Sequence, residues 1–275
     1  MKPLDLSKLP ELVRTKADAL GEIGKAWLEG LLDHVRTLEC RWAMSTGTLL
    51  SGGSEALVLE AQIEGRDAVL KISLPQDVGL KHEAKVLGLA QGQGYAELFA
   101  HDEALNAILV ERLGRPLGET GVSEREQIER LCVTAQSAWI NIGPDAGFTT
   151  GAGKARWLRE FIESATAKDP SAVSEALNSQ AITLTLKREA AWSARASLLV
   201  HGDVHSFNTL EDLRAHGRFK LVDPDGYFMQ SEYDLGLIIR DFHADLRGGH
   251  PLTEGRARCR RLAEATGLDE EAIWQ

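Results

Sequence analysis

The sequence predicts an α+β fold with two lobes, a small N-terminal lobe built on an antiparallel sheet and a larger, mainly helical C-terminal lobe. The first lobe is indicated by short apolar runs bounded by turn residues, as is typical of strands; these runs cover residues 56–63, 68–72, 98–100 and 107–110. The later part of the chain is instead rich in segments of helical periodicity. We place the lobes at residues 1–110 and 118–275, with a connector at 111–117 that is rich in Gly, Pro and polar residues.

The N-terminal lobe is expected to open with two helices, because apolar residues recur at helical spacing over residues 8–40. A glycine-rich hairpin turn, Gly52-Gly53-Ser54, then precedes the strand 56–63. Paired glycines most often only make a turn, and the segment lacks the glycine and lysine pattern of a P-loop. Placed between two strands, its backbone N–H groups could also cover phosphate groups.

Two charged residues of this lobe are predicted to form a pair. Alternation along strand 68–72 puts Lys71 on the face opposite Leu70. In the following helix Glu83 lies on the same stripe as the apolar residues Leu80 and Leu87. Either charge alone is more often exposed to solvent. Because an inward carboxylate needs a partner, we predict a contact between Lys71 and Glu83.

The C-terminal lobe is expected to begin with a capping box, Ser123 to Glu126, ahead of an apolar-periodic helix. Three helical stretches are then predicted at about residues 154–167, 171–179 and 181–196. These helices carry no chemical motif of their own. Acidic residues on them are more often solvated helix faces than ligands of a cationic substrate.

The most informative segment is His201-Gly202-Asp203-Val204-His205-Ser206-Phe207-Asn208, followed by Leu221-Val222-Asp223. A base and two magnesium ligands at such spacing are typical of phosphoryl transfer, which depends on positioning charge around the transferred group. Asp203 is the candidate base that accepts a hydroxyl proton. Asn208 and Asp223 supply the hard oxygen ligands that Mg²⁺ prefers. Residues 197–200 and 218–222 are expected to form short strands on either side of this loop.

These residues resemble the aminoglycoside phosphotransferases, in the branch of streptomycin 6-kinases and hydroxyurea phosphotransferases. The resemblance covers nearly the whole chain and also includes Gly52–Ala56, Val69–Lys71, Val110–Leu113, Asp223–Gly226 and Tyr233–Leu235. It implies a protein-kinase-like fold and the use of ATP and Mg²⁺. One departure lies in the motif, where Phe207 replaces a small glycine and could alter either the backbone angles of the loop or its contacts with the acceptor.

The same resemblance implies further roles. Lys71, held by Glu83, would grip the α and β phosphates of ATP. The backbone of Glu111 and Leu113 would hydrogen-bond the adenine ring, and Gly52-Gly53-Ser54 would cover the phosphates.

A protein kinase is disfavoured, because only ten residues separate Asp223 from Asp234 and leave no room for an activation segment.

Four neighbours of the motif are expected to support it. His201 and His205 are interpreted as braces of the loop backbone, since no third soft ligand lies at the spacing of a zinc site. Asp225 either assists a metal or the acceptor, or forms a simple turn. Asp234 is expected to cap the helix 235–244 while bracing the catalytic loop.

Composition sets broad limits on function. A formal net charge of −10 disfavours nucleic acid or an anionic membrane as a partner and only weakly favours a cationic substrate. The three cysteines, Cys40, Cys132 and Cys259, are far apart and are expected to be reduced and mostly buried. Residues 1–7 lack the apolar core of a signal peptide, and no apolar run is long enough for a membrane span. We expect a cytoplasmic enzyme.

The sequence thus predicts a kinase that transfers the γ-phosphate of ATP to a hydroxyl of a small molecule. A streptomycin-like aminoglycoside is the leading acceptor, which would confer resistance by O-phosphorylation. A kinase of an endogenous sugar or amino alcohol shares every motif and remains the alternative. A nucleotide-binding pseudokinase is less favoured, because Lys71, Asp203 and Asp223 are all present.

Overall fold

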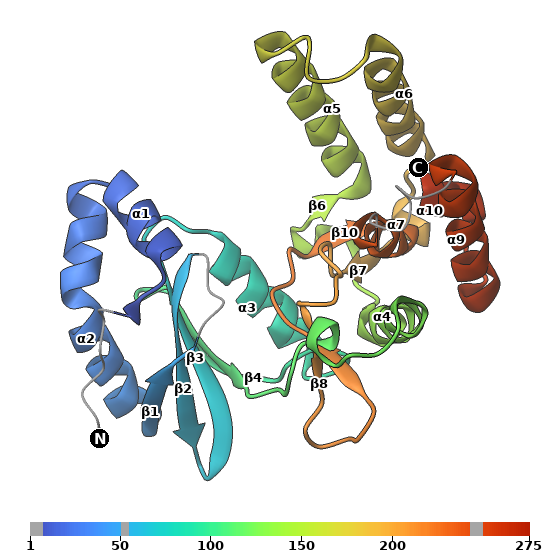
Figure 1. Cartoon of the computed structure of the whole chain (residues 1–275). Coiled ribbons are helices and arrows are strands. Elements are labelled where there is room, and N and C mark those ends of the chain that lie inside the picture. The colour runs from blue at the N-terminus through green and yellow to red at the C-terminus, as the bar shows by residue number, and fades with distance from the viewer. Residues whose placement is uncertain (1–7, 51–54, 243–249) are drawn as a thin grey trace. The chain divides into compact units, whose positions relative to one another are not determined.

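The computed structural model describes residues 8–50, 55–242 and 250–275 of the chain (Figure 1). The chain divides into two compact units, Met1–Gly114 and Arg115–Gln275. The division lies inside segment 111–117, whose role as a hinge stays a prediction. The first unit holds a sheet with helices and the second is mainly helical, so the predicted α+β fold class is confirmed.

Unit 1 contains a five-stranded antiparallel sheet in the order β1-β2-β3-β5-β4. Its strands are β1 (Met44–Leu49), β2 (Ala56–Ile63), β3 (Arg66–Ser73), β4 (Leu98–Asp102) and β5 (Ala107–Glu111), and its helices are α1 (Glu11–Ala19), α2 (Glu22–Trp42) and α3 (Gly79–Ala90). The two opening helices and the sheet agree with the sequence prediction. Strand β1, which precedes the expected glycine-rich turn, spans Met44–Leu49.

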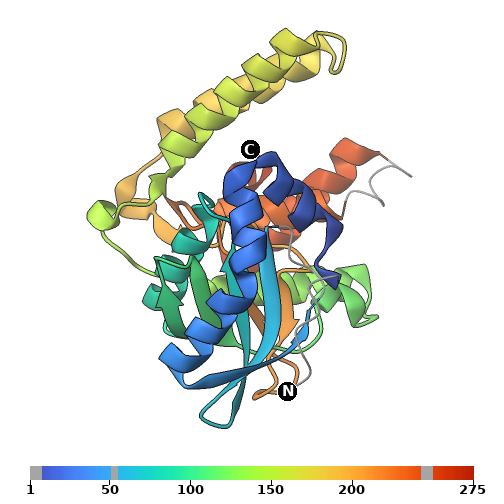
Figure 2. The ribbon, with the colours of Figure 1, turned by 90° about the vertical axis from the view of Figure 1, so that its left-hand side faces the viewer.

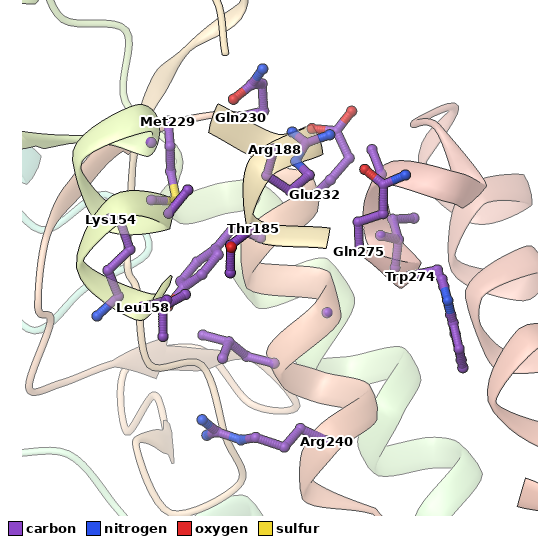
Figure 3. A pocket seen from close by; sticks show the side chains of 17 residues that line it. Lys154, Leu158, Thr185, Arg188, Met229, Gln230, Glu232, Arg240, Trp274 and Gln275 are labelled. Carbon is purple, nitrogen blue, oxygen red and sulfur yellow. The ribbon is translucent and has the colours of Figure 1, made fainter. Parts of the chain in front are cut away.

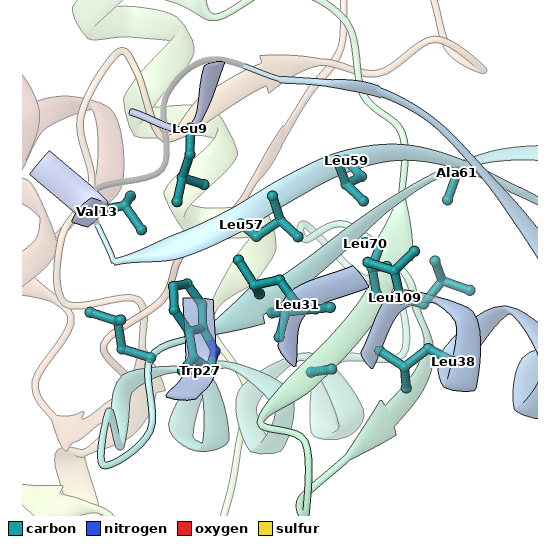
Figure 4. Close-up of a cluster of buried hydrophobic side chains, with 14 of the residues drawn as sticks. Leu9, Val13, Trp27, Leu31, Leu38, Leu57, Leu59, Ala61, Leu70 and Leu109 are labelled. Atoms are coloured by element: carbon teal, nitrogen blue, oxygen red, sulfur yellow. The ribbon is translucent and has the colours of Figure 1, made fainter. Parts of the chain in front are cut away.

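The core of unit 1 lies between the sheet and helices α1 and α2. On α2, the buried side chains of Trp27, Leu31 and Leu38 follow helical periodicity, which produces one apolar stripe. This stripe packs against buried leucines of the sheet, including Leu57 and Leu70 (Figure 4). Each buried leucine contributes about 1.5–3 kcal/mol to folding. Leu70 points into this core. Because successive side chains of a strand point to opposite faces, Lys71, the next residue of β3, points away from it.

Unit 2 is built from helices and very short strands. Its elements are η2 (Leu117–Glu119), α4 (Glu124–Ala138), η3 (Pro144–Ala146), β6 (Thr149–Thr150), α5 (Gly151–Lys168), α6 (Glu175–Ala191), η4 (Ala194–Ala196), β7 (Leu198–Val200), β8 (Thr209–Glu211), β9 (Phe219–Leu221), β10 (Tyr227–Met229), α7 (Glu232–Asp241), α9 (Pro251–Thr266) and α10 (Glu270–Trp274). Helices α5 and α6 pack side by side as a long hairpin (Figure 2).

The helix boundaries of unit 2 partly differ from the prediction. The capping box before α4 is confirmed, because the Ser123 hydroxyl accepts a hydrogen bond from the Glu126 amide. The prediction of three helical stretches after residue 154 is wrong, since α5 and α6 are the two helices between residues 151 and 191. Side-chain caps explain both starts: Thr150 caps α5 and Ser174 caps α6. No Gly or Pro interrupts the chain near residue 180, so α6 continues through the predicted break.

The strands predicted around the motif are present but belong to different sheets. β7 pairs with β10 in a three-stranded sheet that also includes β6, whereas β9 pairs with β8. Strands β8 and β10, each three residues long, were not predicted. The motif therefore connects two sheets and is held at both ends.

The structure bears on two expectations drawn from composition, one about the cysteines and one about membrane-spanning segments. Cys132 and Cys259 are buried, and burial raises the pKa of each thiol to about 11. Cys40 is exposed, and none of the three forms a disulfide. Across residues 8–50, 55–242 and 250–275, no helix is both long and apolar enough to cross a membrane.

Candidate active site

The loop between β7 and β8 carries the sequence motif, and β9 brings the second acidic position to it. In the antiparallel pair of β8 and β9, Thr209 lies opposite Leu221. The Val222 amide continues the pairing by donating to the Asn208 carbonyl at 2.9 Å. Because Asp223 follows Val222 directly, this short sheet places the two predicted metal ligands beside each other.

Asp203 is held by two cationic or polar partners. Its Oδ2 lies 3.4 Å from His205 Nε2, and its Oδ1 lies 3.3 Å from Arg240 Nη2. The hydrogen bond from His205 is the main reason why the pKa of Asp203 lies below its usual value, with Arg240 acting in the same direction against partial burial. The side chain is 38% exposed, so an acceptor hydroxyl can reach an ionised carboxylate.

His201 holds the start of the loop from inside the protein. Its Nδ1 accepts a hydrogen bond from the Asp203 amide at 3.0 Å, so Nε2 carries the proton and donates to the Val222 carbonyl at 2.9 Å. The ring is fully buried, and burial lowers its pKa and keeps it neutral. The ring therefore ties the base to the strand that carries Asp223.

Asp234 is the second brace of the loop. Its two carboxylate oxygens accept hydrogen bonds from the amides of His201 and Gly202, at 3.0 and 2.8 Å, and from Trp139 Nε1 at 3.0 Å. Burial raises the pKa of this carboxyl group. The expected capping position is wrong, because α7 begins at Glu232 and Asp234 lies in its first turn. Its oxygens satisfy the loop backbone instead of the helix end.

Gly202 allows a tyrosine to pack directly on the loop. Its φ is +91°, and a Cβ at this position would lie 2.6 Å from the Tyr227 ring. The Tyr227 hydroxyl accepts a hydrogen bond from Lys154 Nζ at 2.8 Å and donates one to Asp225 Oδ2 at 3.0 Å. Asp225 thus has a specific partner in addition to its place in a turn.

Sequence reasoning missed Lys154, Tyr227 and Arg240. Lys154 lies on α5 and Arg240 on α7, and neither belongs to a recognisable motif. They meet the site only because their helices pack beside β10 and the loop. An isolated basic residue on an amphipathic helix gives no signal that separates this position from a solvated one.

Asn208 and Asp223 fit a magnesium ion by their chemistry. Asn208 Nδ2 donates to the backbone carbonyl of Asp203 at 3.2 Å and lies 3.4 Å from its Oδ2, which leaves the amide oxygen as the ligand atom. The Asp223 carboxylate is on an exposed residue whose φ is +56°. A carboxylate and an amide oxygen are suitable ligands for this cation. The metal role of both residues stays a prediction.

The unusual Phe207 does not distort the loop. It does not adopt a positive φ, so the position has no need of a glycine. Its amide donates to His205 Nδ1 at 3.2 Å, and its ring is 60% exposed. A Cβ added to Gly118 of η2 would lie 3.3 Å from the ring, which locates the phenyl group against that turn.

In unit 1, the predicted partners Lys71 and Glu83 form an ion pair, with Lys71 Nζ 2.8 Å from Glu83 Oε1. Their side chains are only 12% and 7% exposed. Lys71 lies on the face of β3 that points away from the core with α2, as strand alternation predicts. Because both charged groups are buried, the loss of either one would leave the other buried without this ion-pair partner. Their role in gripping phosphates stays a prediction.

The structure describes only some of the other residues that are predicted to bind the nucleotide. Gly52, Gly53 and Ser54 lie outside the described residues. The Glu111 amide donates to the Glu97 carbonyl at 2.8 Å, and its carboxylate accepts from the Glu97 amide at 3.1 Å. Leu113 is buried. The adenine role of both residues stays a prediction.

Unit 2 contains a cavity of about 240 Å³ that reaches Arg240, the ion-pair partner of Asp203. It lies among α5, α6, α7 and the segment of α10 (Figure 3). Arg240, which contacts Asp203, and Lys154 both line it. A small molecule in this cavity would therefore lie beside the candidate base.

The matched family and a curated relative show that the chain is a phosphotransferase with an alcohol group as acceptor. Residues 41–275 match the family described as aminoglycoside/hydroxyurea antibiotic resistance kinase, and the chain belongs to this family. The streptomycin 6-kinase of Streptomyces griseus is 25% identical over 226 residues, which cover 78% of this chain and 68% of that protein. The suspected family and the kinase branch are therefore confirmed.

Solved structures show the same fold. A macrolide 2'-phosphotransferase type I has a TM-score of 0.59 and 16% identity, covering 88% of this chain and 86% of its own. An aminoglycoside-3'-phosphotransferase of type VIII has a TM-score of 0.55 and 20% identity, covering 88% and 94%. A third, aminoglycoside phosphotransferase APH(4)-Ia in complex with AMP-PNP and hygromycin B, has a TM-score of 0.53 and 18% identity, covering 83% and 88%.

Proposed function

We propose that this chain transfers the γ-phosphoryl group of ATP to a hydroxyl group of a small molecule bound in unit 2. The observation that carries the proposal is the ionised Asp203 beside the cavity, linked through His201 to the strand that bears Asp223. ATP as donor is supported by the ion pair of Lys71 and Glu83. The APH(4)-Ia relative, whose solved complex contains AMP-PNP, has the same fold.

In the proposed reaction the acceptor hydroxyl lies against Asp203. Its oxygen forms a bond to the γ-phosphorus while the bond from that phosphorus to the bridging oxygen breaks, and ADP leaves. The Asp203 carboxylate takes the hydroxyl proton. His205 and Arg240 keep this carboxylate ionised and oriented. A magnesium ion bound by Asn208 and Asp223 would neutralise charge on the phosphate oxygens.

The family favours an aminoglycoside acceptor, and the relative from Streptomyces griseus is named for streptomycin. Phosphorylation of such an antibiotic by this chain would confer resistance. The second candidate is a kinase of a sugar or amino-alcohol metabolite. One observation favours the sugar of these two, because among the described residues the basic side chains outnumber the acidic ones in the lining of the cavity.

The test is an acceptor-dependent ADP-release assay with MgATP across streptomycin, other aminoglycosides, hydroxyurea and simple sugars. Wild-type protein is expected to release ADP with at least one acceptor, and Asp203→Ala is expected to lose that release. An Asp212→Ala variant, changed at a turn between β8 and β9, is the matched control. Unchanged turnover in Asp203→Ala would remove the assignment of the base.

A further inference from the structure

The ammonium group of Lys154 lies between two aromatic rings of unit 2. Its Nζ is 4.4 Å from the ring centroid of Trp157 and 4.5 Å from that of Tyr227. A cation within about 6 Å of a ring centroid is attracted by the negative face of the ring, most strongly by Trp. Lys154 and Trp157 are three residues apart on α5 and share one face of this helix, whereas Tyr227 belongs to β10. Trp157 and Tyr227 thus form a recess for a cation, here termed the aromatic recess.

Two carboxylates add negative charge to the aromatic recess. The Tyr227 hydroxyl accepts a hydrogen bond from Lys154 Nζ at 2.8 Å and donates one to Asp225 Oδ2 at 3.0 Å. The charges of Asp225 and Asp203 favour the ammonium form of Lys154, but burial has the larger effect and lowers its pKa. Aromatic rings around a positive charge are the arrangement by which proteins recognise organic ammonium ligands. The recess therefore has the chemistry of a binding site for an organic cation.

The aromatic recess is open to a ligand and close to the candidate base. Lys154 lines the cavity of about 240 Å³ together with Arg240, whose Nη2 lies 3.3 Å from Asp203 Oδ1. Figure 3 shows the charged ends of Lys154 and Arg240 directed to the same side of the cavity. The Trp157 side chain is 52% exposed, so a ligand can reach its ring. A ligand with its cation in the recess would therefore have its other groups within reach of Asp203.

Lys154 is held in a way that allows it to leave. Among residues 8–50, 55–242 and 250–275 it forms no direct ion pair, and Asp225 acts on it through the Tyr227 hydroxyl. The ammonium group is carried on a flexible four-carbon stem. A guanidinium group is more weakly hydrated than an ammonium group, so it loses less on entering such a partly buried place. A cationic ligand can therefore take the position of the Lys154 ammonium.

We propose that Lys154 occupies the position at which the ammonium or guanidinium group of the acceptor binds, and that the acceptor displaces it from the aromatic recess. The acceptor is then a hydroxylated organic cation, held by Trp157, Tyr227 and Asp225 while one of its hydroxyl groups meets Asp203. Lys154 acts as an internal competitor that fills the recess in the free protein. The inference rests on the proposed function and specifies how this chain recognises a cationic acceptor.

The first test removes the internal competitor. Calorimetric titration of the full chain without ATP measures the binding of streptomycin, and of kanamycin as a cation that carries amino groups only. Lys154→Ala is expected to lower the Kd for the cation that binds by about threefold to tenfold, because the alanine does not compete for the rings. An unchanged or raised Kd would overturn the inference. Lys168→Ala, at an exposed lysine of the same helix, is the control and should bind as wild type does.

The second test changes one ring of the recess. Trp157→Leu is expected to raise the Kd for the same cation by about threefold to tenfold, and Trp157→Phe should keep most of the affinity because it keeps a ring face. Phe161→Leu, which changes the ring stacked on Trp157 one turn along α5, is the control and should have the smaller effect. If Trp157→Phe or Phe161→Leu lost as much affinity as Trp157→Leu, the ring face would not be what binds the cation, and the inference would be overturned.

Turnover tests the proposed function separately. Failure of streptomycin, other aminoglycosides, hydroxyurea and sugars to release ADP would contradict the proposed function, whereas the Kd values of the variants still decide the inference. Conversely, neither streptomycin nor kanamycin binds to wild type or to Lys154→Ala if the recess is not a cation site. That result, together with ADP release in the presence of a neutral sugar, would overturn the inference and leave the proposed function intact.

Discussion

The catalytic loop and the cavity beside it are built in contrasting ways. The loop, residues 201–208 with Asp223, is held by short backbone contacts and by two buried side chains, His201 and Asp234. The cavity draws its wall from helices spread between residues 151 and 275. The loop therefore shows its chemistry in a local pattern, whereas the cavity exists only where distant helices meet.

The difference also concerns charge. The whole chain carries a formal net charge of −10, which weakly favours a cationic substrate. Among the residues that the structure describes, the lining of the cavity includes the basic Lys154, Arg188 and Arg240 and the acidic Glu232. Net charge is dominated by solvated surface residues and governs solubility more than recognition. The net charge of this chain therefore does not indicate the chemistry of its acceptor.

The largest effect is expected in the loop. Asp203→Asn removes the base but keeps the shape of the side chain, so kcat should fall by about 10²–10⁴-fold. The ranking of acceptors by KM should not change, because the cavity wall is intact. Steady-state ADP release with two acceptors measures both quantities, and Asp212→Asn provides the control. A changed ranking would mean that loop and cavity do not act separately.

The next effect concerns the buried ion pair of unit 1. Lys71→Met leaves the Glu83 carboxylate buried without this partner and should lower the free energy of unfolding by roughly 3–5 kcal/mol. The double variant Lys71→Met with Glu83→Leu should recover much of that loss. Both variants should raise KM for ATP without altering the choice of acceptor.

Denaturant unfolding and ATP titrations of these two variants separate stability from nucleotide binding. Lys81→Met, at an exposed lysine of α3, is the matched control. A double variant with normal KM for ATP would contradict the nucleotide role of the pair. Equal stability of the single variant and wild type would show that the buried charge is solvated by other means.

Asp234→Ala tests the brace of the loop and should have a smaller effect on stability. It removes the acceptors of three N–H groups, and the free energy of unfolding should fall by about 3 kcal/mol, together with kcat. Urea unfolding and ADP release measure the two effects. Asp145→Ala, at an exposed acid of the same unit, should change neither. Full activity of Asp234→Ala would show that the loop keeps its geometry unaided.

The smallest effect is a pH dependence of the cavity. Burial lowers the pKa of Lys154, so this residue loses its charge at a lower pH than an ordinary lysine. A lowered folded-state pKa penalises the protonated protein, so stability should increase as pH rises from the folded-state pKa toward the unfolded-state value. Over the same interval KM for the acceptor should change by about two- to threefold, because Lys154 lines the cavity.

Lys154→Arg sharpens this measurement, because arginine stays charged at alkaline pH. Its KM for the acceptor should stay constant where that of wild type changes, and a Lys187→Arg control should follow wild type. Identical profiles for Lys154→Arg and wild type would remove Lys154 from acceptor recognition.

The sequence by itself determined the residues whose chemistry is tied to local spacing. Asp203, Asn208 and Asp223 could be identified because one loop and one strand bring them together. The contact of Lys71 with Glu83 followed from strand alternation and helix periodicity, which are local rules. The same rules gave the fold class, although they misjudged the helices after residue 154 where side-chain caps decide the boundaries.

Only the tertiary structure decided the rest of the site. Lys154, Arg188 and Arg240 belong to three helices, and no periodicity indicates that they line one cavity. For Asp234, the predicted bracing of the loop is confirmed by its bonds to the loop amides, whereas the predicted helix cap is wrong because α7 begins at Glu232. Long-range packing determines which side chains come into contact. The same series of helices and loops is compatible with many packing arrangements, so the sequence pattern does not indicate which contacts form. The charge presented to an acceptor is therefore a property of the folded protein.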